Sequence, residues 1–232
     1  MSAASTASTA GTAGRADVDT AEDAVPESRT VWANRTFEAL WGAAYDFGVE
    51  HPRFAKPFAR AVMRSDLNRF YEALDTAGAE PDGSAILDVP CGGGIGLRGL
   101  RPQQQVRYVA ADISDVMLER ARRRAAERGL TSVRTVEADI TRMPFDDGEF
   151  DLVLCFNGLH ILPDPRAAVQ EMARCLRQGG RLVGECIVRT EVRRTDTLIR
   201  VLRSVGVFGN PGTVGDVRSW LTGAGLRVRE LQ

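Results

Sequence analysis

Short apolar segments alternate with amphipathic segments from residue 84 onward, and this alternation limits the fold more than any other feature. We expect strands over residues 84–89, 105–111, 132–138, 150–156, 181–188 and 226–231, and helices over 94–100, 115–128, 165–177, 194–205 and 214–223. The run 152–156 is continuously apolar, which is typical of a strand buried on both faces of a parallel sheet. The pattern predicts an α/β fold with a mostly parallel sheet between two layers of helices.

The N-terminal part of the chain has a different composition. Residues 2–14 are all Ala, Ser, Thr or Gly, and several acidic residues follow them. Such a segment has too little apolar surface to offset the entropy of ordering it. We therefore divide the chain into a disordered tail (1–28), an N-terminal helical segment (29–80) and an α/β domain (81–232).

The helical segment is rich in aromatic residues. Phe37, Trp41 and Tyr45 are spaced four residues apart, so they share one helix face. These rings either pack on the domain beneath or cover a ligand as a lid, and the two interpretations are compatible. As a lid, the aromatic side chains predict an apolar or aromatic small molecule as the ligand. The aromatic residues concerned are Trp41, Tyr45, Phe54 and Phe58.

Charge and cysteine content exclude several classes of protein. Lys and Arg number 30 against 31 Asp and Glu, a balance that argues against a dedicated nucleic-acid binder. The arginines of residues 120–128 are expected to form a solvated helix face. No apolar run reaches the length of a membrane span. Four dispersed cysteines and two histidines give no pattern of a metal site or a disulfide framework, so we expect a cytoplasmic protein without a metal.

A glycine-rich turn follows the first expected strand. The sequence reads Asp88-Val89-Pro90-Cys91-Gly92-Gly93-Gly94-Ile95-Gly96. Glycines allow a tight turn and the close approach of a ligand, and the start of the next helix offers free N–H groups to an anionic group. Residues 94–99 also match the dinucleotide pattern G-x-G-x-x-G, which on its own is weak evidence. Gly94, the first glycine of this pattern, comes five residues after Val89, the last expected strand residue, and this placement suits a nicotinamide cofactor poorly.

These residues resemble the first motif of the class I S-adenosylmethionine (SAM)-dependent methyltransferases, roughly [DE]-x-G-x-G-x-G. The similarity is greatest to the small-molecule type 11 group, which includes methyltransferases of ubiquinone and menaquinone biosynthesis. Asp88, Pro90, Gly92 and Gly94 occupy the motif positions, with Cys91 between them. Pro90 replaces the first glycine, which removes one backbone N–H group from the turn. The resemblance implies a Rossmann-like, doubly wound sheet over residues 81–232 and SAM as cofactor.

A second acid lies at the end of the second expected strand. Asp112 follows Asp88 by 24 residues, and a carboxylate there can accept two hydrogen bonds from a ribose diol. The resemblance assigns Asp112 to the ribose of SAM and places Ile113 and Met117 beside the adenine. The alternative is that Asp112 is an acid at a helix N-terminus, stabilised by the helix dipole.

The resemblance assigns further residues to the cofactor. Asp139 and Ile140 fall where the family contacts the adenine amino group and ring. Asn157 and Gly158 follow the fourth strand, where the family contacts the methionine moiety. Tyr45, followed by Asp46, is similar to a pair in many lids of this family, where the tyrosine approaches SAM. The cofactor residues implied are Tyr45, Asp88, Pro90, Cys91, Gly92, Gly94, Asp112, Ile113, Met117, Asp139, Ile140, Asn157 and Gly158.

The predicted activity is transfer of the SAM methyl group to O, N or C of a small molecule. Because the sulfonium already activates the methyl group, alignment and exclusion of water can suffice. His160 is the candidate general base, and the alternative is that it is a structural histidine. A SAM-binding enzyme with other chemistry and an NAD-type oxidoreductase are the alternative functions.

The end of the sheet departs from the family pattern. The family closes its sheet with a seventh, antiparallel strand, whereas residues 226–231 would form only the sixth. We therefore expect an open sheet edge, and with it either low stability of the monomer or pairing with another molecule, for instance as a homodimer.

Overall fold

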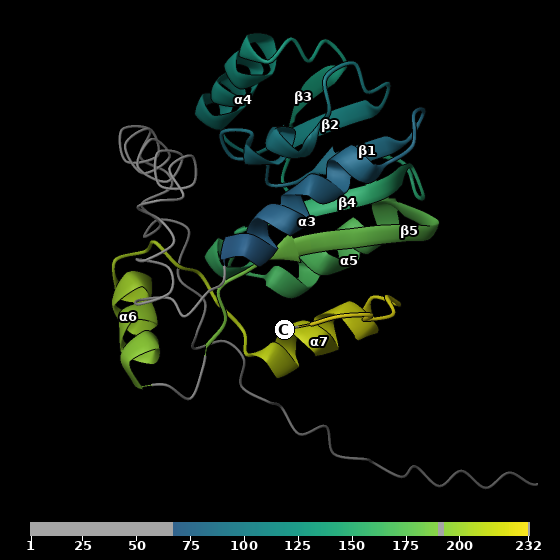
Figure 1. Cartoon of the computed structure of the whole chain (residues 1–232). Helices are drawn as coiled ribbons and strands as arrows, with labels where there is room; N and C mark the ends of the chain where they lie inside the picture. The colour runs from purple at the N-terminus through teal and green to yellow at the C-terminus, as the bar shows by residue number, and fades with distance from the viewer. Residues whose placement is uncertain (1–66, 190–192, 232) are drawn as a thin grey trace, which may run out of the picture.

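The computed structural model describes residues 67–189 and 193–231, which form a five-stranded sheet with helices on both faces (Figure 1). The strands are β1 (Ala85–Asp88), β2 (Arg107–Asp112), β3 (Val133–Glu137), β4 (Phe150–Phe156) and β5 (Leu176–Glu185). The α-helices are α3 (Leu67–Ala79), α4 (Asp115–Glu127), α5 (Pro165–Cys175), α6 (Arg193–Ser204) and α7 (Val214–Gly223), with 3-10 helices η4 (Ile95–Gly99) and η5 (Leu159–Ile161). The strand order is β3-β2-β1-β4-β5, and every pair is parallel. The predicted Rossmann-like, doubly wound fold is confirmed.

The parallel register brings the carboxyl ends of all five strands to one edge. Asp88 pairs with Ala110 on β2 and with Leu154 on β4. Asp112 pairs with Glu137 on β3. In open α/β sheets ligands bind outside this edge, where the strand order reverses, and here the reversal lies between β1 and β4.

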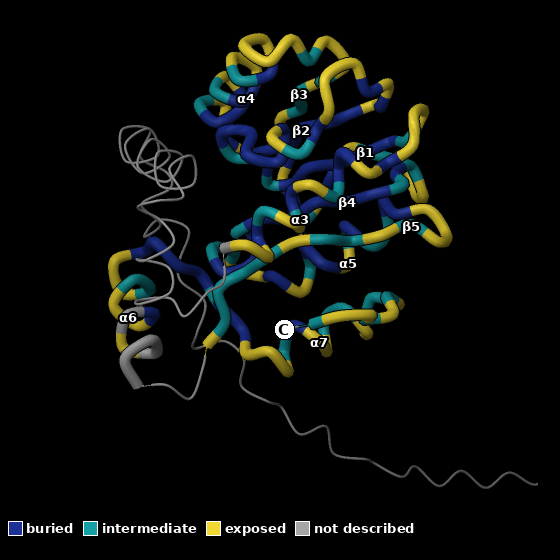
Figure 2. The backbone as a smooth tube through the Cα atoms, viewed as in Figure 1, coloured by how far each residue is buried: buried dark blue, intermediate teal, exposed yellow. Residues whose placement is uncertain are grey.

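Two apolar cores separate the sheet from its helices. On one face, α3, η4 and α4 pack against side chains of β1, β2 and β4, including the fully buried Leu74 and Leu118. On the other face, α5 and α7 pack against alternate residues of the same strands, and Met172 of α5 and Val153 of β4 belong to this cluster. The central strands β1, β2 and β4 are therefore almost wholly buried, whereas exposed residues lie on the outer helix surfaces, the loops and the edge strands β3 and β5 (Figure 2). This is why the sequences of the central strands are almost continuously apolar.

Local capping explains where the helices begin. The Ser114 side chain accepts a hydrogen bond from the Met117 backbone N–H at the start of α4. Thr213 and Asp216 form a reciprocal capping box at the start of α7. Each arrangement satisfies N–H groups that have no partner within the helix.

Two predicted helices differ from the structure. The segment 94–100 forms only a short 3-10 helix, η4, and the helix expected over 165–177 ends at Cys175. There the chain becomes extended because Leu176 pairs with Phe150, at the start of a strand with an irregular register. Tertiary pairing thus overrides the helical pattern of the last two residues.

The strand predicted over residues 226–231 is wrong. The segment has no strand structure, and the Leu226 backbone N–H donates to the carbonyl of Leu221 at the end of α7. Leu226 packs with the side chains of α5 and α7, and the chain runs back along α7 (Figure 1). An alternating apolar pattern gives a strand only where a neighbouring strand edge is available. In the described part of the chain, β5 therefore stays at the sheet edge.

The predicted tail and most of the predicted lid, with Trp41, Tyr45, Phe54 and Phe58, lie outside the described residues. The last part of the predicted lid is α3, whose Phe70 stacks edge-on against Phe156 of β4. α3 is thus part of the core of the α/β domain. Within the described ranges, no helix is both long enough and apolar enough to cross a bilayer.

Candidate functional site

The turn after β1 is shaped by glycines at positive φ. Gly92 has φ +49° and Gly94 has φ +83°, values that other residues adopt at a conformational cost. At Gly94 a Cβ atom would lie 3.1 Å from the Ala121 backbone of α4, so this glycine permits close packing of the turn on the helix. At Gly92 the corresponding position is open, with no atom within 4 Å. The backbone at Gly92 can therefore be approached by a ligand.

Asp112 connects the end of β2 to this turn. Its Oδ2 accepts a hydrogen bond of 2.8 Å from the Gly92 backbone N–H, and its Oδ1 accepts one of 3.0 Å from Ser114. The carboxylate is only 6% exposed. Beside it, the Ile113 side chain is 67% exposed, whereas Met117 is buried on α4. An acid, an accessible glycine backbone and an exposed apolar side chain thus lie together at the carboxyl edge.

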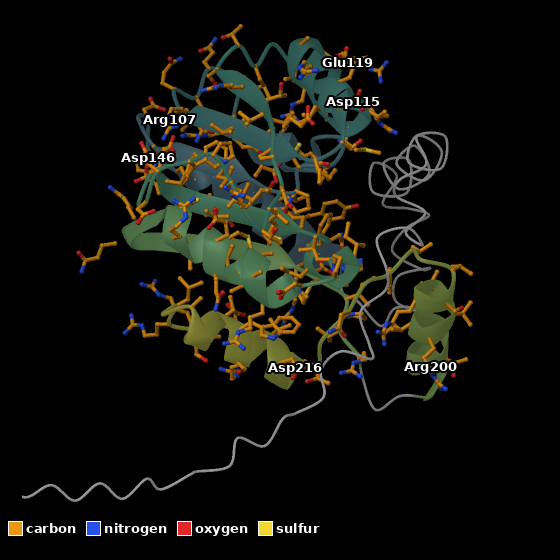
Figure 3. All side chains as sticks on the ribbon, turned by 180° about the vertical axis from the view of Figure 1, so that it is seen from behind. Arg107, Asp115, Glu119, Asp146, Arg200 and Asp216 are labelled. Carbon is orange, nitrogen blue, oxygen red and sulfur yellow. The ribbon has the colours of Figure 1, made fainter. Side chains whose placement is uncertain are left out.

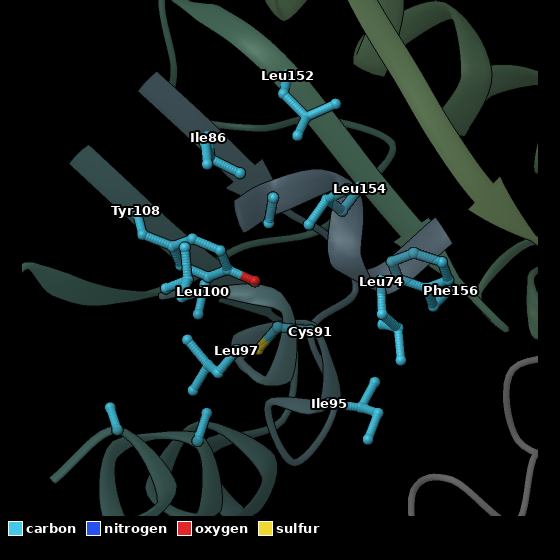
Figure 4. Close-up of a cluster of buried hydrophobic side chains, with 14 of the residues drawn as sticks. Leu74, Ile86, Cys91, Ile95, Leu97, Leu100, Tyr108, Leu152, Leu154 and Phe156 are labelled. Carbon is cyan, nitrogen blue, oxygen red and sulfur yellow. The ribbon is translucent and has the colours of Figure 1, made fainter. Parts of the chain in front are cut away.

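Asp88 lies beneath the same turn. Its Oδ2 accepts a hydrogen bond of 2.8 Å from the Tyr108 hydroxyl, and the side chain is 1% exposed. Figure 4 shows the Tyr108 hydroxyl pointing toward the turn that carries Cys91. Burial raises the pKa of Asp88 to about 7, with a smaller contribution from the neighbouring Asp112 charge and against the lowering effect of the Tyr108 hydrogen bond. Gly96 covers this pair, because a Cβ there would lie 2.5 Å from Asp88 Oδ2.

Cys91 forms part of the turn without offering a reactive thiol. The residue is buried, and its backbone N–H donates to the Ala111 carbonyl over 2.8 Å. Burial raises the pKa of the Cys91 thiol well above its ordinary value, and the Asp112 and Asp88 charges add to the shift. A thiol that stays protonated is a poor nucleophile. Cys91 therefore holds the turn against β2 through its backbone.

Asp139 follows β3 at the same edge of the sheet. Its Oδ1 accepts hydrogen bonds from the Thr141 backbone N–H at 2.8 Å and from the Thr141 hydroxyl at 2.7 Å. Asp139 is exposed, whereas the next residue, Ile140, is 5% exposed and belongs to a core cluster. The turn is tied to β2 by the Ala138 backbone N–H, which donates to the Asp112 carbonyl. Asp139 is therefore held in a fixed turn one strand away from Asp112.

Asn157 and Gly158 leave the end of β4 next to the glycine turn. Asn157 adopts φ +56°, and its backbone N–H donates to the Glu185 carbonyl at the end of β5. Gly158 lies directly against the Pro90 ring, which follows a cis peptide bond, and a Cβ at residue 158 would overlap that ring. The loops after β1 and β4 are thus in contact.

His160 is packed into the protein interior. It is 5% exposed, its Nδ1 accepts a hydrogen bond of 3.3 Å from the Ile187 backbone N–H, and its ring meets Phe208 edge-on. Burial lowers the pKa of His160 to about 3. A ring with this pKa is a weak base at neutral pH, so these surroundings are those of a structural histidine.

A shallow cavity of about 320 Å³ lies away from this site, toward the amino ends of β2 and β3. Arg107 and Asp146, two of its lining residues, lie at the end of the domain opposite to Asp115, which begins α4 beside Asp112 (Figure 3). None of the predicted site residues lines this cavity. Over residues 67–189 and 193–231, no group of three His, Cys, Asp or Glu side chains is arranged to hold a metal ion.

The structure thus brings most of the predicted cofactor residues to one edge of the sheet. The turn residues contact Asp112 directly and Gly158 through Pro90, and Asp139 lies beyond the adjacent strand. Tyr45 lies outside the described residues. The sequence analysis gave no role to Tyr108 and Gly96, which enclose Asp88. A tyrosine inside an otherwise apolar strand was the available signal, because a buried hydroxyl needs a partner.

Comparisons with known proteins find similarity to methyltransferases. Residues 87–184 match the family model described as a methyltransferase domain. The chain is 41% identical over 111 residues to the demethylmenaquinone methyltransferase of Clavibacter sepedonicus, covering 48% of this chain and 44% of that protein. It is 32% identical over 167 residues to the ubiquinone/menaquinone biosynthesis C-methyltransferase of Shewanella oneidensis, covering 66% and 63%. The chain thus spans less than two thirds of the length of either relative.

The fold is likewise similar to solved structures. A provisionally assigned methyltransferase of Bacillus halodurans superimposes with a TM-score of 0.62 at 26% identity, over 70% of this chain and 71% of that one. The matched family segment runs from the middle of β1 to the end of β5, and so contains the glycine turn, Asp112, Asp139 and the exit of β4. The resemblance inferred from the motifs is confirmed, because residues 87–184 match the methyltransferase-domain model and align with methyltransferases in both relatives.

Proposed function

We propose that this protein is a SAM-dependent methyltransferase that acts on a small molecule. The observation that carries the proposal is the contact between the glycine turn and the acid of the next strand, where Gly92 N–H lies 2.8 Å from Asp112 Oδ2. This contact places a carboxylate beside an approachable backbone at the carboxyl edge of a parallel sheet. Such an edge is where α/β proteins bind nucleotide-like ligands.

The residues at this edge fit an adenosyl group. Asp112 would accept hydrogen bonds from the ribose hydroxyls, and the exposed Ile113 side chain together with Met117 would line the adenine. Asp139 and Ile140 would contact the adenine amino group and ring. Asn157 and Gly158 would line the methionine moiety, next to Pro90 and Cys91. When bound, SAM supplies a methyl group already activated by a positive sulfur.

The chain's own contribution to the reaction is positional. The turn and the exits of β2, β3 and β4 are fixed by hydrogen bonds to one another, so they can hold the donor and the acceptor in one orientation. Holding two reactants in line contributes roughly 7–11 kcal/mol to the barrier reduction of a bimolecular reaction. No protein nucleophile is required, which is consistent with buried thiols whose pKa is raised by burial, such as Cys91 and Cys155.

His160 is assigned a structural role, in place of the general base that the sequence suggests. We expect His160→Asn to keep kcat within about threefold at pH 8, because a buried neutral ring contributes little proton transfer, whereas loss of a true general base lowers the rate by about 10²–10⁴. The asparagine Oδ1 can still accept the hydrogen bond from Ile187. The pH profile of kcat and a thermal melt of both proteins provide the measurement. If kcat falls about 100-fold while the melting temperature is unchanged, His160 acts as a general base after all.

The acceptor is proposed to be an apolar or aromatic small molecule of the quinone class. The names of the two relatives refer to demethylmenaquinone and to ubiquinone and menaquinone biosynthesis, and the second name, a C-methyltransferase, supports carbon as the methylated atom. The aromatic residues expected in the lid support the same class.

Four free cysteines are compatible with the cytoplasmic location expected from the sequence. A homodimer also stays a prediction at this point.

Two measurements test the proposed function. In calorimetry, we expect SAM and S-adenosylhomocysteine to bind with micromolar affinity and NAD to give no signal. Binding of NAD alone would replace the proposal with an oxidoreductase. A labelled-methyl assay, with demethylmenaquinone and simple quinones offered in oxidised and reduced forms, then tests for transfer. SAM binding without labelled product from any acceptor would favour a SAM-binding enzyme with other chemistry.

A further inference from the structure

The cavity at the amino ends of β2 and β3 takes no part in the proposed function. All of its lining residues fall between Arg107 and Glu149, in the middle of the described range 67–189. Its volume of about 320 Å³ falls in the range of small-molecule sites. Arg107 and Asp146, which line it, lie at the end of the domain opposite to the cofactor edge (Figure 3). A molecule bound here would therefore be a second ligand, separate from SAM.

β2 and β3 form one wall of the cavity. Val109 pairs with Arg134 in the parallel register, so the two side chains lie on the same face of the sheet. Arg107 and Val136 lie on this face as well, because side chains alternate along a strand. Val109 and Val136 belong to the apolar cluster of this face. The wall thus combines two apolar side chains with two guanidinium groups.

The loop between β3 and β4 forms the other wall. Arg174 of α5 fixes this loop, because its guanidinium group donates to the carbonyl oxygens of Phe145 at 2.8 Å and of Met143 at 3.3 Å. The Phe145 ring packs edge-on against Phe150, with the ring centroids 5.2 Å apart. The wall is held by the protein's own contacts, so the cavity is preformed, as small-molecule sites usually are.

Two of the four charged side chains in the cavity neutralise each other. Arg107 Nη1 lies 2.6 Å from Glu149 Oε1, and Arg107 Nη2 donates to the Glu149 carbonyl over 3.0 Å. The other carboxylate oxygen of Glu149 accepts a hydrogen bond of 2.9 Å from the Asp146 backbone N–H. The Arg107 guanidinium also lies over the Phe150 ring, 4.9 Å from its centroid. These two side chains are therefore parts of the walls.

The other two charged groups are the Arg134 guanidinium and the Asp146 carboxylate. Over residues 67–189 and 193–231, neither of them forms a hydrogen bond or an ion pair. They line the same cavity and yet form no ion pair with each other. The cavity thus offers one cation, one anion and apolar surface to a ligand.

This set of groups is complementary to a small zwitterion, and we propose that the cavity binds a free α-amino acid with an apolar side chain. Arg134 pairs with the carboxylate of the ligand and Asp146 with its ammonium group. The apolar side chain of the ligand lies against Val109 and Val136. A simple anion would meet the Asp146 charge and a simple cation the Arg134 charge, so the charges select a ligand that carries both.

Leucine and two analogues test this selection. 3-Methylbutylamine is leucine without its carboxylate, and 4-methylpentanoate is leucine without its ammonium group. We titrate each into the isotope-labelled full chain, up to about 10 mM, and follow binding by NMR. Since each analogue lacks one contact with a solvent-exposed charge, we expect leucine to bind about fivefold more tightly than either.

Arg134→Gln and Asp146→Asn separate the two contacts. R134Q should weaken leucine about fivefold and leave the affinity for the amine unchanged. D146N should weaken leucine to the same extent and leave the affinity for 4-methylpentanoate unchanged. Arg166→Gln, an exposed arginine of α5, and Asp75→Asn, an exposed acid of α3, are the matched controls and should bind leucine as the wild type does.

Three results would overturn the proposal. The first is that leucine, valine and phenylalanine all leave the spectrum unchanged at the highest concentration. The second is that either analogue binds as tightly as leucine, and the third is that R134Q and D146N leave leucine binding intact. Both variants should bind SAM as the wild type does, because neither residue lies at the cofactor edge. Failure of this proposal and failure of the proposed methyl transfer are thus measured separately.

Discussion

Asp112→Ala is expected to weaken SAM binding by at least about 100-fold, because each hydrogen bond to a charged group contributes roughly 1.5–3 kcal/mol and the carboxylate would accept two from the ribose. The substitution also removes the acceptor for the Gly92 N–H, which fixes the turn at this edge. Isothermal titration calorimetry with SAM and with S-adenosylhomocysteine measures the effect. We expect the loss to be similar for both ligands, because they share the ribose.

Asp82→Ala is the matched control for this experiment. Asp82 also accepts a backbone hydrogen bond, from Gln105 at 3.0 Å, but it lies before β1, at the opposite end of the sheet. We expect D82A to bind SAM as the wild type does and to show a comparable small change in melting temperature. If D112A retains affinity within about tenfold while folded, the proposed ribose contact is wrong.

The sheet could be predicted because its central strands are recognisable from their apolar sequences alone. The apolar run of β4 was assigned to residues 150–156, and the structure gives the same bounds. Strands buried on both faces need apolar residues at every position, so the signal does not depend on the partner strand. The segment 226–231 shows the converse, because its alternating pattern needed a neighbouring edge that the chain does not place beside it.

The candidate site could be predicted where the local backbone conformation or the position at a strand end requires one type of residue. Glycine at residues 92 and 94 is required by positive φ, and an acid at the end of β2 follows from the chain order. Environments that several elements build together were not predictable. His160 is enclosed by Ile187 and by Phe208, which lies after α6, and only the folded chain shows that its ring is buried.

Asp88 is likewise enclosed by residues from several elements. Its burial leads to a second prediction, which concerns the pH dependence of stability. The resemblance placed this acid at the cofactor, while the structure shows a buried carboxyl under Gly96 that accepts from Tyr108. Burial raises the pKa of Asp88 from 3.8 to about 7. The folded state therefore binds a proton that the unfolded state releases between these two values, and the folded protein loses stability as pH rises through this window.

Asp88→Asn should remove this dependence. The amide stays neutral at every pH, and its oxygen can still accept from the Tyr108 hydroxyl. Since one pKa unit corresponds to about 1.36 kcal/mol, we expect the free energy of unfolding of D88N, relative to wild type, to rise by about 2–3 kcal/mol between pH 5 and pH 8.5. Urea denaturation of both proteins at the two pH values provides the measurement.

Asp75→Asn is the control for the change of an acid to an amide. Asp75 is exposed on α3, so its replacement should shift stability by less than about 0.5 kcal/mol at either pH. A constant difference between D88N and wild type across the two pH values would mean that Asp88 is ionised in the folded protein throughout. The raised pKa would then be excluded, and the buried carboxylate would need stronger partners than the Tyr108 hydroxyl. An Asp88 that is ionised at pH 5 would also place a negative charge beneath the glycine turn, next to Asp112.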